Sequence, residues 1–232
     1  RDAAVALLQL QGRGQEASLR VPAYSLAALD REIQLFPEWF LERHLHLALT
    51  AVEREALELV FARLATAALE QTQVLVHRDF HSRNLMVLPA HGPGVIDFQD
   101  ALAGPVGYDL ASIFKDCYIR WPRERVEAWV LAHRQALRRQ GASTLAGASD
   151  AEFLRWFDLV SVQRHLKILG IFARLWWRDG KSGYLADLPL TVEYLQDSCG
   201  RYAELAPLGT WLQQQVTPQL AAAHARALAD RS

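Results

Sequence analysis

Most of this chain places apolar residues at the three- and four-residue spacing of an amphipathic helix. The clearest case is the segment 51–69, where Leu57, Val60, Phe61 and Leu64 fall on one face. The spacing predicts helices over residues 2–11, 25–46 with a break at Pro37, 51–69, 108–117, 123–139, 151–175, 190–202 and 209–229. Residues 15–24 are expected to be loop, and residues 141–149 a linker between two helices.

Between residues 73 and 98 the apolar residues no longer follow the helical spacing. Short apolar runs at 74–76, 85–88 and 94–96 predict three strands, and the Pro- and Gly-containing segment 89–93 predicts the turn between the last two. The fold class is therefore α+β and mainly α, with a small β-hairpin island at 73–98 inside a helical chain.

A dense polar segment lies between the first two predicted strands. His77 to Asn84 has the pattern H-R-D-x-x-x-x-N, and Asp97 ends the third strand. In phosphoryl transfer an Asp at the third position accepts the proton of the attacking hydroxyl. The Asn and a later Asp supply oxygen ligands to Mg²⁺, which neutralises the phosphates. The pattern therefore predicts Asp79 as the base and Asn84 and Asp97 as metal ligands.

Two other interpretations of this segment were weighed. One is a loop whose polar side chains only satisfy one another. The other is a metallohydrolase site built on His77-x-Asp79-x-His81, which needs further ligands at matching positions. Neither His91 nor His133 lies in a pattern that supports such a site.

The octet, the hairpin after it and the strand ending in Ile-Asp-Phe resemble the aminoglycoside phosphotransferase and choline kinase superfamily, which has a protein-kinase-like fold. The segment 104–111 is similar to the family's stretch after the metal-binding Asp. The resemblance implies a structural role for Asp109, which would hold the catalytic loop and cap a helix. It also implies a supporting role for Arg78 and an orienting role for His77.

Further stretches are similar to one subgroup, the anomeric N-acetylmuramate/N-acetylglucosamine kinases of peptidoglycan recycling. These stretches are residues 30–40, 97–101, 162–175 and 178–185. The resemblance implies an enzyme that uses ATP and Mg²⁺ to phosphorylate a small sugar. Two alternatives stay open: a kinase of another small alcohol, such as an aminoglycoside or choline, and a kinase-like binding protein without catalysis.

Substrate contacts are expected from side chains near the motif or on the similar stretches. The candidates are Gln99, Asp100, Glu38, Arg164, His165 and Lys167. Arg164 and Lys167 are three residues apart on a predicted helix, so they share a face that could meet a carboxylate. The competing interpretation is a solvated helix face with ordinary ion pairs. For Trp39, packing in the core is the favoured interpretation.

The family's N-terminal lobe, with its phosphate-covering glycine loop and strand lysine, has no counterpart here. The three lysines, Lys115, Lys167 and Lys181, all follow the catalytic loop, and residues 12–17 lack the last glycine of G-x-G-x-x-G. Residues 1–232 are therefore expected to be the C-terminal, catalytic and substrate-binding lobe, with the N-terminal nucleotide-covering lobe absent from the chain.

The amino-acid composition limits the kinds of partner that the chain is expected to bind. The chain has 25 Lys and Arg against 26 Asp and Glu, a formal net charge of −1. A nucleic-acid binder normally carries a basic excess, and no polybasic segment favours a membrane surface. Cys117 and Cys199 form no metal-binding or CxxC pattern, so both are expected to be buried free thiols, which favours the cytoplasm. No feature of the sequence indicates an oligomeric state.

Overall fold

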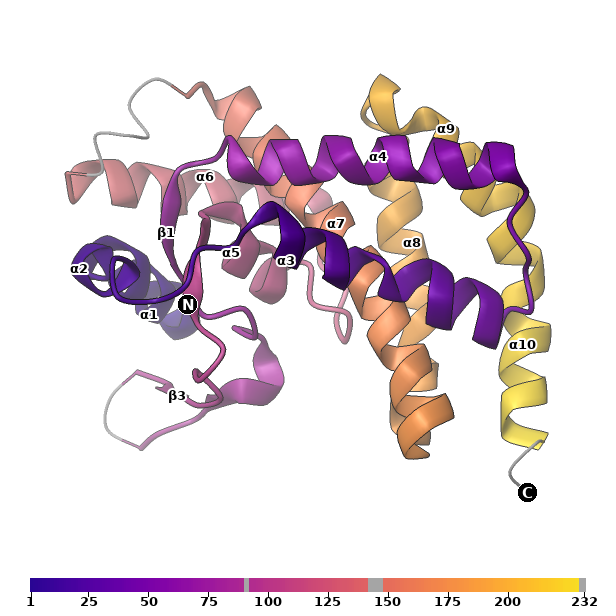
Figure 1. Ribbon diagram of the computed structural model, residues 1–232. Coiled ribbons are helices and arrows are strands. Elements are labelled where there is room, and N and C mark those ends of the chain that lie inside the picture. Colours follow the sequence, from indigo (N-terminus) through magenta and orange to yellow (C-terminus); the bar gives the residue numbers. More distant parts are fainter. Residues whose placement is uncertain (90–91, 142–147, 230–232) are drawn as a thin grey trace. The chain divides into compact units, whose positions relative to one another are not determined.

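The computed structural model describes residues 1–89, 92–141 and 148–229. The chain divides into two compact units (Figure 1). Unit 1 contains residues 1–26 and 66–161, and unit 2 contains residues 27–65 and 162–232. Helix α4 (Ala51–Leu69) begins in unit 2 and ends in unit 1, whereas α7 (Asp150–Asp179) begins in unit 1 and ends in unit 2.

Two small antiparallel sheets lie in unit 1. Strand β1 (Gln73–Val76) pairs with β4 (Leu102–Pro105), with Val74 opposite Gly104. Strands β2 (Leu85–Met86) and β3 (Gly94–Val95) form a hairpin, drawn at the lower left of Figure 1. The predicted strands are confirmed, although β2 and β3 are each shorter than expected.

Strand β4 extends the predicted island beyond residue 98. Its sequence, Leu-Ala-Gly-Pro, has neither alternation nor β-branched residues, so the sequence pattern gave no strand signal there. Gly104 lies in close packing, because a Cβ at this position would lie 2.8 Å from Cδ1 of Leu102 and 3.3 Å from the Val76 side chain. The island therefore ends at residue 105, and sheet pairing rather than local pattern sets that end.

The remaining elements of unit 1 are helical. They are α1 (Asp2–Arg13), α2 (Gln15–Ser18), the 3₁₀ turn η2 (Ser82–Asn84), α5 (Gly107–Phe114) and α6 (Arg123–Arg139). Helix α1 packs against α6 and β1. Gln11 joins α1 to α6 and to the residue after β4: its Nε2 donates to the Val106 carbonyl at 3.2 Å, and its Oε1 lies 2.8 Å from Nε2 of His133 in α6.

Unit 2 is entirely helical in the described residues. Its elements are α3 (Leu26–Ile33, starting at the unit boundary), the π-helix η1 (Phe36–His44), η4 (Ser182–Asp187), α8 (Leu188–Cys199), η5 (Ala203–Leu205), α9 (Ala206–Trp211), the π-helix η6 (Leu212–Val216) and α10 (Thr217–Ala229). The predicted break near Pro37 is confirmed, because α3 ends at Ile33 and Pro37 lies in the first turn of η1. A proline is tolerated there since its missing N–H has no helical partner to lose. Gly170 of α7 packs against the short segment between α3 and η1. A Cβ on Gly170 would clash with the Leu35 backbone in that segment.

Reciprocal side-chain caps mark where the two longest helices begin. Before α4, Thr50 Oγ1 accepts from the Glu53 N–H while the Glu53 carboxylate accepts from Thr50. Ser149 and Glu152 make the same arrangement before α7. This S/T-x-x-E box satisfies backbone donors that the first helical turn leaves free.

Every predicted helix has a counterpart, with ends displaced by up to four residues: the helix predicted over 151–175, for example, is Asp150–Asp179. The predicted helices 51–69 and 123–139 are confirmed to the residue. The loop expected over 15–24 was wrong in its first part, where α2 forms. Residues 90–91 of the expected turn and 142–147 of the expected linker lie outside the described residues.

The expectation that Cys117 and Cys199 are buried free thiols is confirmed. No helix in the described part of the chain combines the length and apolar character needed to cross a lipid bilayer.

Candidate active site

The polar loop 77–84 is held at its start by Asp109 of α5. Asp109 is fully buried, and its carboxylate accepts the backbone N–H of His77 at 2.8 Å and that of Arg78 at 3.0 Å. The expected cap is wrong, because α5 begins at Gly107 and Val106 holds the N-cap position without a side-chain bond. Asp109 therefore lies inside the first turn, where its charge also suits the positive end of the helix.

Two residues of the site have backbone angles that L-amino acids rarely adopt. Arg78 has φ of 74° and Asp97 has φ of 68°. For a non-glycine residue this left-handed region is unfavourable, and it persists only where surrounding contacts enforce it. The Asp109 carboxylate holds Arg78 in place through its N–H. The strain fixes the directions of the chain on both sides of the site.

The structure brings Asp79, Asn84 and Asp97 together. The Asn84 Nδ2 donates to the Asp79 carbonyl at 3.0 Å and lies 3.4 Å from Oδ2 of Asp97. The β2–β3 hairpin makes this possible, because the Ile96 N–H donates to the Asn84 carbonyl at 3.2 Å. The Asn84 amide group and the Asp97 carboxylate thus meet beside the loop, with the amide nitrogen toward the carboxylate.

These donors fit a hard cation that is also held by phosphate. Asp97 is exposed and Asn84 half-buried, so both can accept a ligand from solvent. Within the described residues, no three His, Cys, Asp or Glu side chains are grouped to hold a metal ion alone. Mg²⁺ commonly takes only one or two protein carboxylates and completes its shell with water and substrate phosphates.

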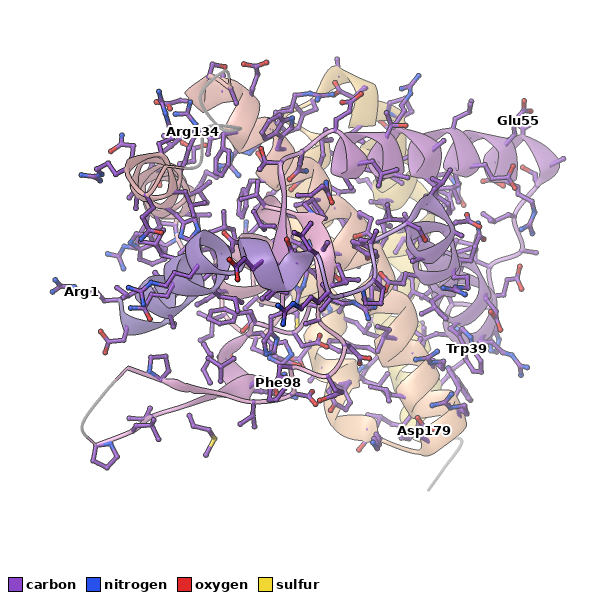
Figure 2. All side chains as sticks on the ribbon, turned by 60° about the vertical axis from the view of Figure 1, so that its left-hand side comes forward. Arg1, Trp39, Glu55, Phe98, Arg134 and Asp179 are labelled. Carbon is purple, nitrogen blue, oxygen red and sulfur yellow. The ribbon has the colours of Figure 1, made fainter. Side chains whose placement is uncertain are left out.

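Gln99 and Asp100 follow Asp97 in an exposed turn. Gln99 Nε2 donates to Oδ1 of Asp97 at 2.8 Å, so this side chain orients the carboxylate. Phe98, between Asp97 and Gln99, is 68% exposed and lies beside the hairpin (Figure 2).

His77 and Arg78 pack beneath the loop. His77 is buried with its ring edge-on to Phe80, and burial lowers the pKa of His77 while the Asp79 carboxylate opposes that shift. The imidazole is therefore neutral near pH 7. The Arg78 guanidinium lies 5.9 Å from the centre of the Tyr24 ring.

A second buried carboxylate, Asp116, holds the far side of the loop. Its Oδ2 accepts the Ser82 Oγ–H at 2.8 Å and the Ser82 N–H at 3.2 Å. Asp116 was not among the predicted site residues. A signal existed, since Asp109, Ser112 and Asp116 are spaced three and four residues apart in a mainly apolar stretch.

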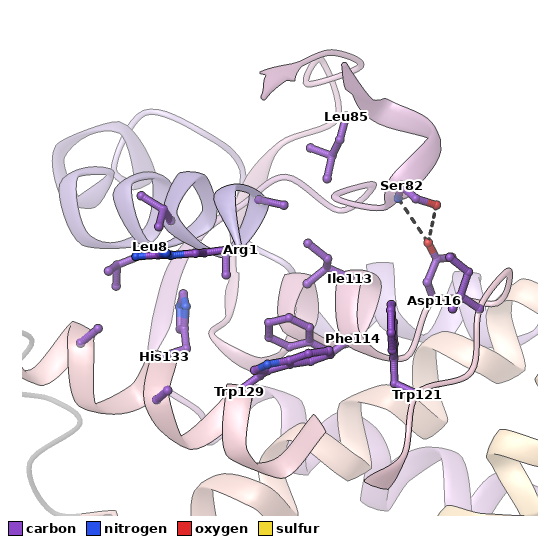
Figure 3. A pocket seen from close by; sticks show the side chains of 16 residues that line it. Arg1, Leu8, Ser82, Leu85, Ile113, Phe114, Asp116, Trp121, Trp129 and His133 are labelled. Atoms are coloured by element: carbon purple, nitrogen blue, oxygen red, sulfur yellow. Dashed lines mark hydrogen bonds between the residues drawn. The ribbon is translucent and has the colours of Figure 1, made fainter. Parts of the chain in front are cut away.

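A cavity of about 700 Å³ lies in unit 1 next to this contact. Figure 3 shows Ser82 and Asp116 at its edge, with Phe114, Trp121 and Trp129 along its wall. The aromatic rings contact one another, Trp129 lying 5.3 Å from Phe114 and 5.4 Å from Trp121. The lining is mainly apolar, and the Asp116 carboxylate and Ser82 are among its few polar groups.

Behind Asp116, a buried ion cluster links α5, α6 and α7. Lys115 Nζ lies 2.8 Å from the carboxylate of Asp158, and Arg123 donates to both oxygens of the same group at 2.5 and 2.7 Å. Burial opposes the charge of Asp158, and the two cations overcome that effect, so its pKa lies below the ordinary value. The cluster fixes the backbone beside Asp116.

The other expected substrate residues belong to unit 2. Glu38 is exposed at the start of η1, and Trp39 is half-buried with the Arg43 guanidinium 5.7 Å from its ring centre. On α7 the residues Arg164, His165 and Lys167 are all buried. The His165 ring stacks on Tyr194 at 5.1 Å, and Lys167 Nζ lies 3.1 Å from Glu32. The solvated helix face considered for Arg164 and Lys167 is therefore wrong.

Residues 1–157 match a family described as "Phosphotransferase enzyme family". Among curated proteins, the chain is 46% identical to an N-acetylmuramate/N-acetylglucosamine kinase of Pseudomonas putida, over 90% of this chain and 60% of that protein. Proteins of the same name match from Pseudomonas aeruginosa (46% identical; 83% of this chain, 56% of that protein) and Neisseria meningitidis (44%; 90% and 61%). The chain thus spans about three fifths of the length of these relatives.

Among solved structures, an ethanolamine kinase of Plasmodium vivax matches with a TM-score of 0.52. The identity is 16%, and the match covers 77% of this chain and 49% of the other. At this identity the likeness concerns the fold. The mainly helical, kinase-like fold with small sheets is confirmed.

Proposed function

Because the chain belongs to the phosphotransferase enzyme family, we propose that it provides the catalytic loop of an ATP-dependent kinase. The acceptor in this proposal is the anomeric hydroxyl of N-acetylmuramate or N-acetylglucosamine, as the names of the curated relatives suggest. The product would be a sugar 1-phosphate that re-enters peptidoglycan precursor synthesis. The buried free thiols support a cytoplasmic setting.

The observation that carries the proposal is the convergence of Asp79, Asn84 and Asp97. Asn84 bonds the backbone of Asp79 and lies beside the Asp97 carboxylate, so one amide side chain connects the other two positions. Among the described residues, the Asp79 carboxylate makes no hydrogen bond or ion pair of its own. It is half-buried, which leaves it able to meet a substrate hydroxyl.

In the proposed reaction the sugar hydroxyl oxygen attacks the γ-phosphorus of ATP, and Asp79 accepts the proton of that hydroxyl. A new O–P bond forms, the bond from that phosphorus to the bridging oxygen breaks, and ADP leaves with the electron pair. Asn84 and Asp97 would hold Mg²⁺, which supplies neutralisation of phosphate charge when bound. Gln99 keeps the Asp97 carboxylate oriented through its 2.8 Å hydrogen bond.

Residues 1–232 would act as the catalytic and substrate-binding lobe, with the nucleotide covered by residues outside them. Substrate roles for Glu38, Asp100, Arg164, His165 and Lys167 stay predictions. Arg164 and Lys167 are the cations that an anionic sugar such as N-acetylmuramate would favour over a cationic aminoglycoside.

The test is transfer of phosphate from ATP to a panel containing N-acetylmuramate, N-acetylglucosamine, an aminoglycoside and choline, using the intact gene product. We expect both amino sugars to be phosphorylated, and Asp79→Asn to lower kcat by roughly a hundredfold or more. The thermal unfolding midpoint should stay unchanged, because the Asp79 carboxylate holds no structural bond. A folded Asp79→Asn protein with full activity would refute the mechanism, and a choline or aminoglycoside preference would refute the acceptor.

A further inference from the structure

The hydrogen bonds inside the loop 77–84 include short turns and the Asn84 side-chain bond to the Asp79 carbonyl. Within it, the His81 N–H donates to the Asp79 carbonyl at 3.0 Å, and the Asn84 N–H donates to the His81 carbonyl at 3.0 Å. Such short turns do not fix where a loop lies relative to the rest of a protein. That position comes from contacts to a rigid element, and here α5 and the residues after it supply them.

Two carboxylates bind the loop, one on each side of Asp79. Asp109 accepts the N–H groups of the two residues that precede Asp79. Asp116 accepts both hydrogen-bond donors of Ser82, three residues after Asp79. Ser82 is also the first residue of the 3₁₀ turn that ends in Asn84. A shift at Ser82 therefore moves Asn84, which bonds the Asp79 carbonyl and lies 3.4 Å from Asp97.

Asp116 is itself anchored. Its side chain is 3% exposed, and its second oxygen lies 3.7 Å from Sγ of Cys117. The preceding residue, Lys115, is tied to Asp158 of α7 in the buried ion cluster. A charged acceptor that is buried and fixed binds its donors more strongly than one in water.

We propose that Asp116 is a positioning residue of the phosphoryl-transfer site, acting through Ser82 to set Asn84 against Asp79 and Asp97. This inference rests on the proposed function of the same site. The bonds of the Asp116 carboxylate go to Ser82 and Cys117 and not to Asp79, Asn84 or Asp97, so its proposed action is on the geometry of the loop.

The experiment compares Asp116→Ala, Asp116→Asn and Ser82→Ala in the intact gene product. Asp116→Ala should lower kcat by roughly tenfold to a hundredfold, because small misplacements of reacting groups cost rates of that order. The KM for the sugar should change less than about twofold, since uniform binding is untouched. Asp116→Asn keeps an acceptor oxygen for Ser82 and should recover most of kcat.

Two variants separate positioning from folding. Ser82 is exposed, so Ser82→Ala should fold normally, and it should lower kcat by a smaller factor because the N–H contact remains. Combining it with Asp116→Ala should add little further loss.

Amide hydrogen exchange tests the contact between Asp116 and Ser82 independently of catalysis. In Asp116→Ala the Ser82 and Asn84 amides should exchange at least about tenfold faster, while amides of α6 keep their protection. Unchanged kcat and unchanged exchange in a folded Asp116→Ala protein would overturn the proposal, as would a raised sugar KM with full kcat. If the unaltered protein transfers no phosphate to any sugar, the proposed function fails, and the exchange measurement still decides the role of Asp116.

Discussion

The loop 77–84 and the helical segment 164–167 both carry a dense run of polar residues, but they use them differently. In the loop, buried carboxylates from elsewhere accept backbone N–H groups, and among the described residues the half-buried Asp79 carboxylate makes no hydrogen bond of its own. In the helix the backbone is already satisfied, and the side chains contact neighbours, as Lys167 does with Glu32. A polar motif is available for function where other residues support its backbone.

The largest effect should follow removal of the support at the start of the loop. Asp109→Ala leaves two N–H groups facing a buried space, so the free energy of unfolding should fall by about 3 kcal/mol or more. Urea denaturation measures it, and kcat should fall with it. Asp109→Asn keeps one acceptor oxygen and should lose less. A loss below about 1 kcal/mol for Asp109→Ala would show that the loop is held in another way.

A smaller effect is expected where the side chains pair with one another. Lys167→Met keeps the length of the side chain but leaves Glu32 largely buried without its cation, which should cost about 2 kcal/mol of unfolding free energy. The double variant Lys167→Met/Glu32→Leu should recover much of that loss. Chemical denaturation of the three proteins tests the pair.

The same Lys167→Met protein decides whether this segment also meets substrate. Packing alone leaves the sugar KM within about twofold of the unaltered value. A KM raised tenfold or more with unchanged stability would instead place Lys167 in the substrate site, and the contrast between loop and helix would then be wrong.

Over the first pH unit below 6.5, the smallest effect per residue is a pH dependence that compares the two units through one buried histidine in each. Burial lowers the pKa of His133 in unit 1 to about 4, and burial with nearby positive charge lowers that of His44 in unit 2 to about 4. Below pH 6.5, the ordinary pKa of histidine, these two side chains bind protons in the unfolded chain but not in the folded chain. Their contribution to the free energy of unfolding is therefore fully present above pH 6.5. It is lost as the pH falls toward 4, by about 1 kcal/mol per histidine per pH unit.

Two substitutions assign this acid sensitivity. His133→Gln keeps a donor for Gln11, and His44→Phe keeps a ring that can stack on Phe40. Each should flatten the fall in unfolding free energy between about pH 6.5 and pH 5, measured by urea denaturation. A curve that neither variant changes would mean that other groups dominate the acid response.

Much of the fold and the centre of the site was predictable because the relevant signals are local. Helical periodicity placed α4 and α6, and the hairpin signals placed Asn84 near Asp97. Strand β4 was not predictable, since its four residues form a strand only through pairing with β1. The pairing of Lys167 with Glu32 joins two helices far apart in the chain, which no helical pattern specifies.

By itself, the sequence determined which residue types stand in the loop and in what order: an Asp, an Asn five positions after it and a second Asp after a hairpin. Spacing of this kind survives without tertiary contacts because it lies within one strand–loop–hairpin segment. Only the tertiary structure decided that Asp109 and Asp116 hold the loop from both sides, and that Arg164, His165 and Lys167 are buried. The physical reason is that hydrogen bonds to a buried carboxylate depend on where distant segments meet, which no local pattern contains.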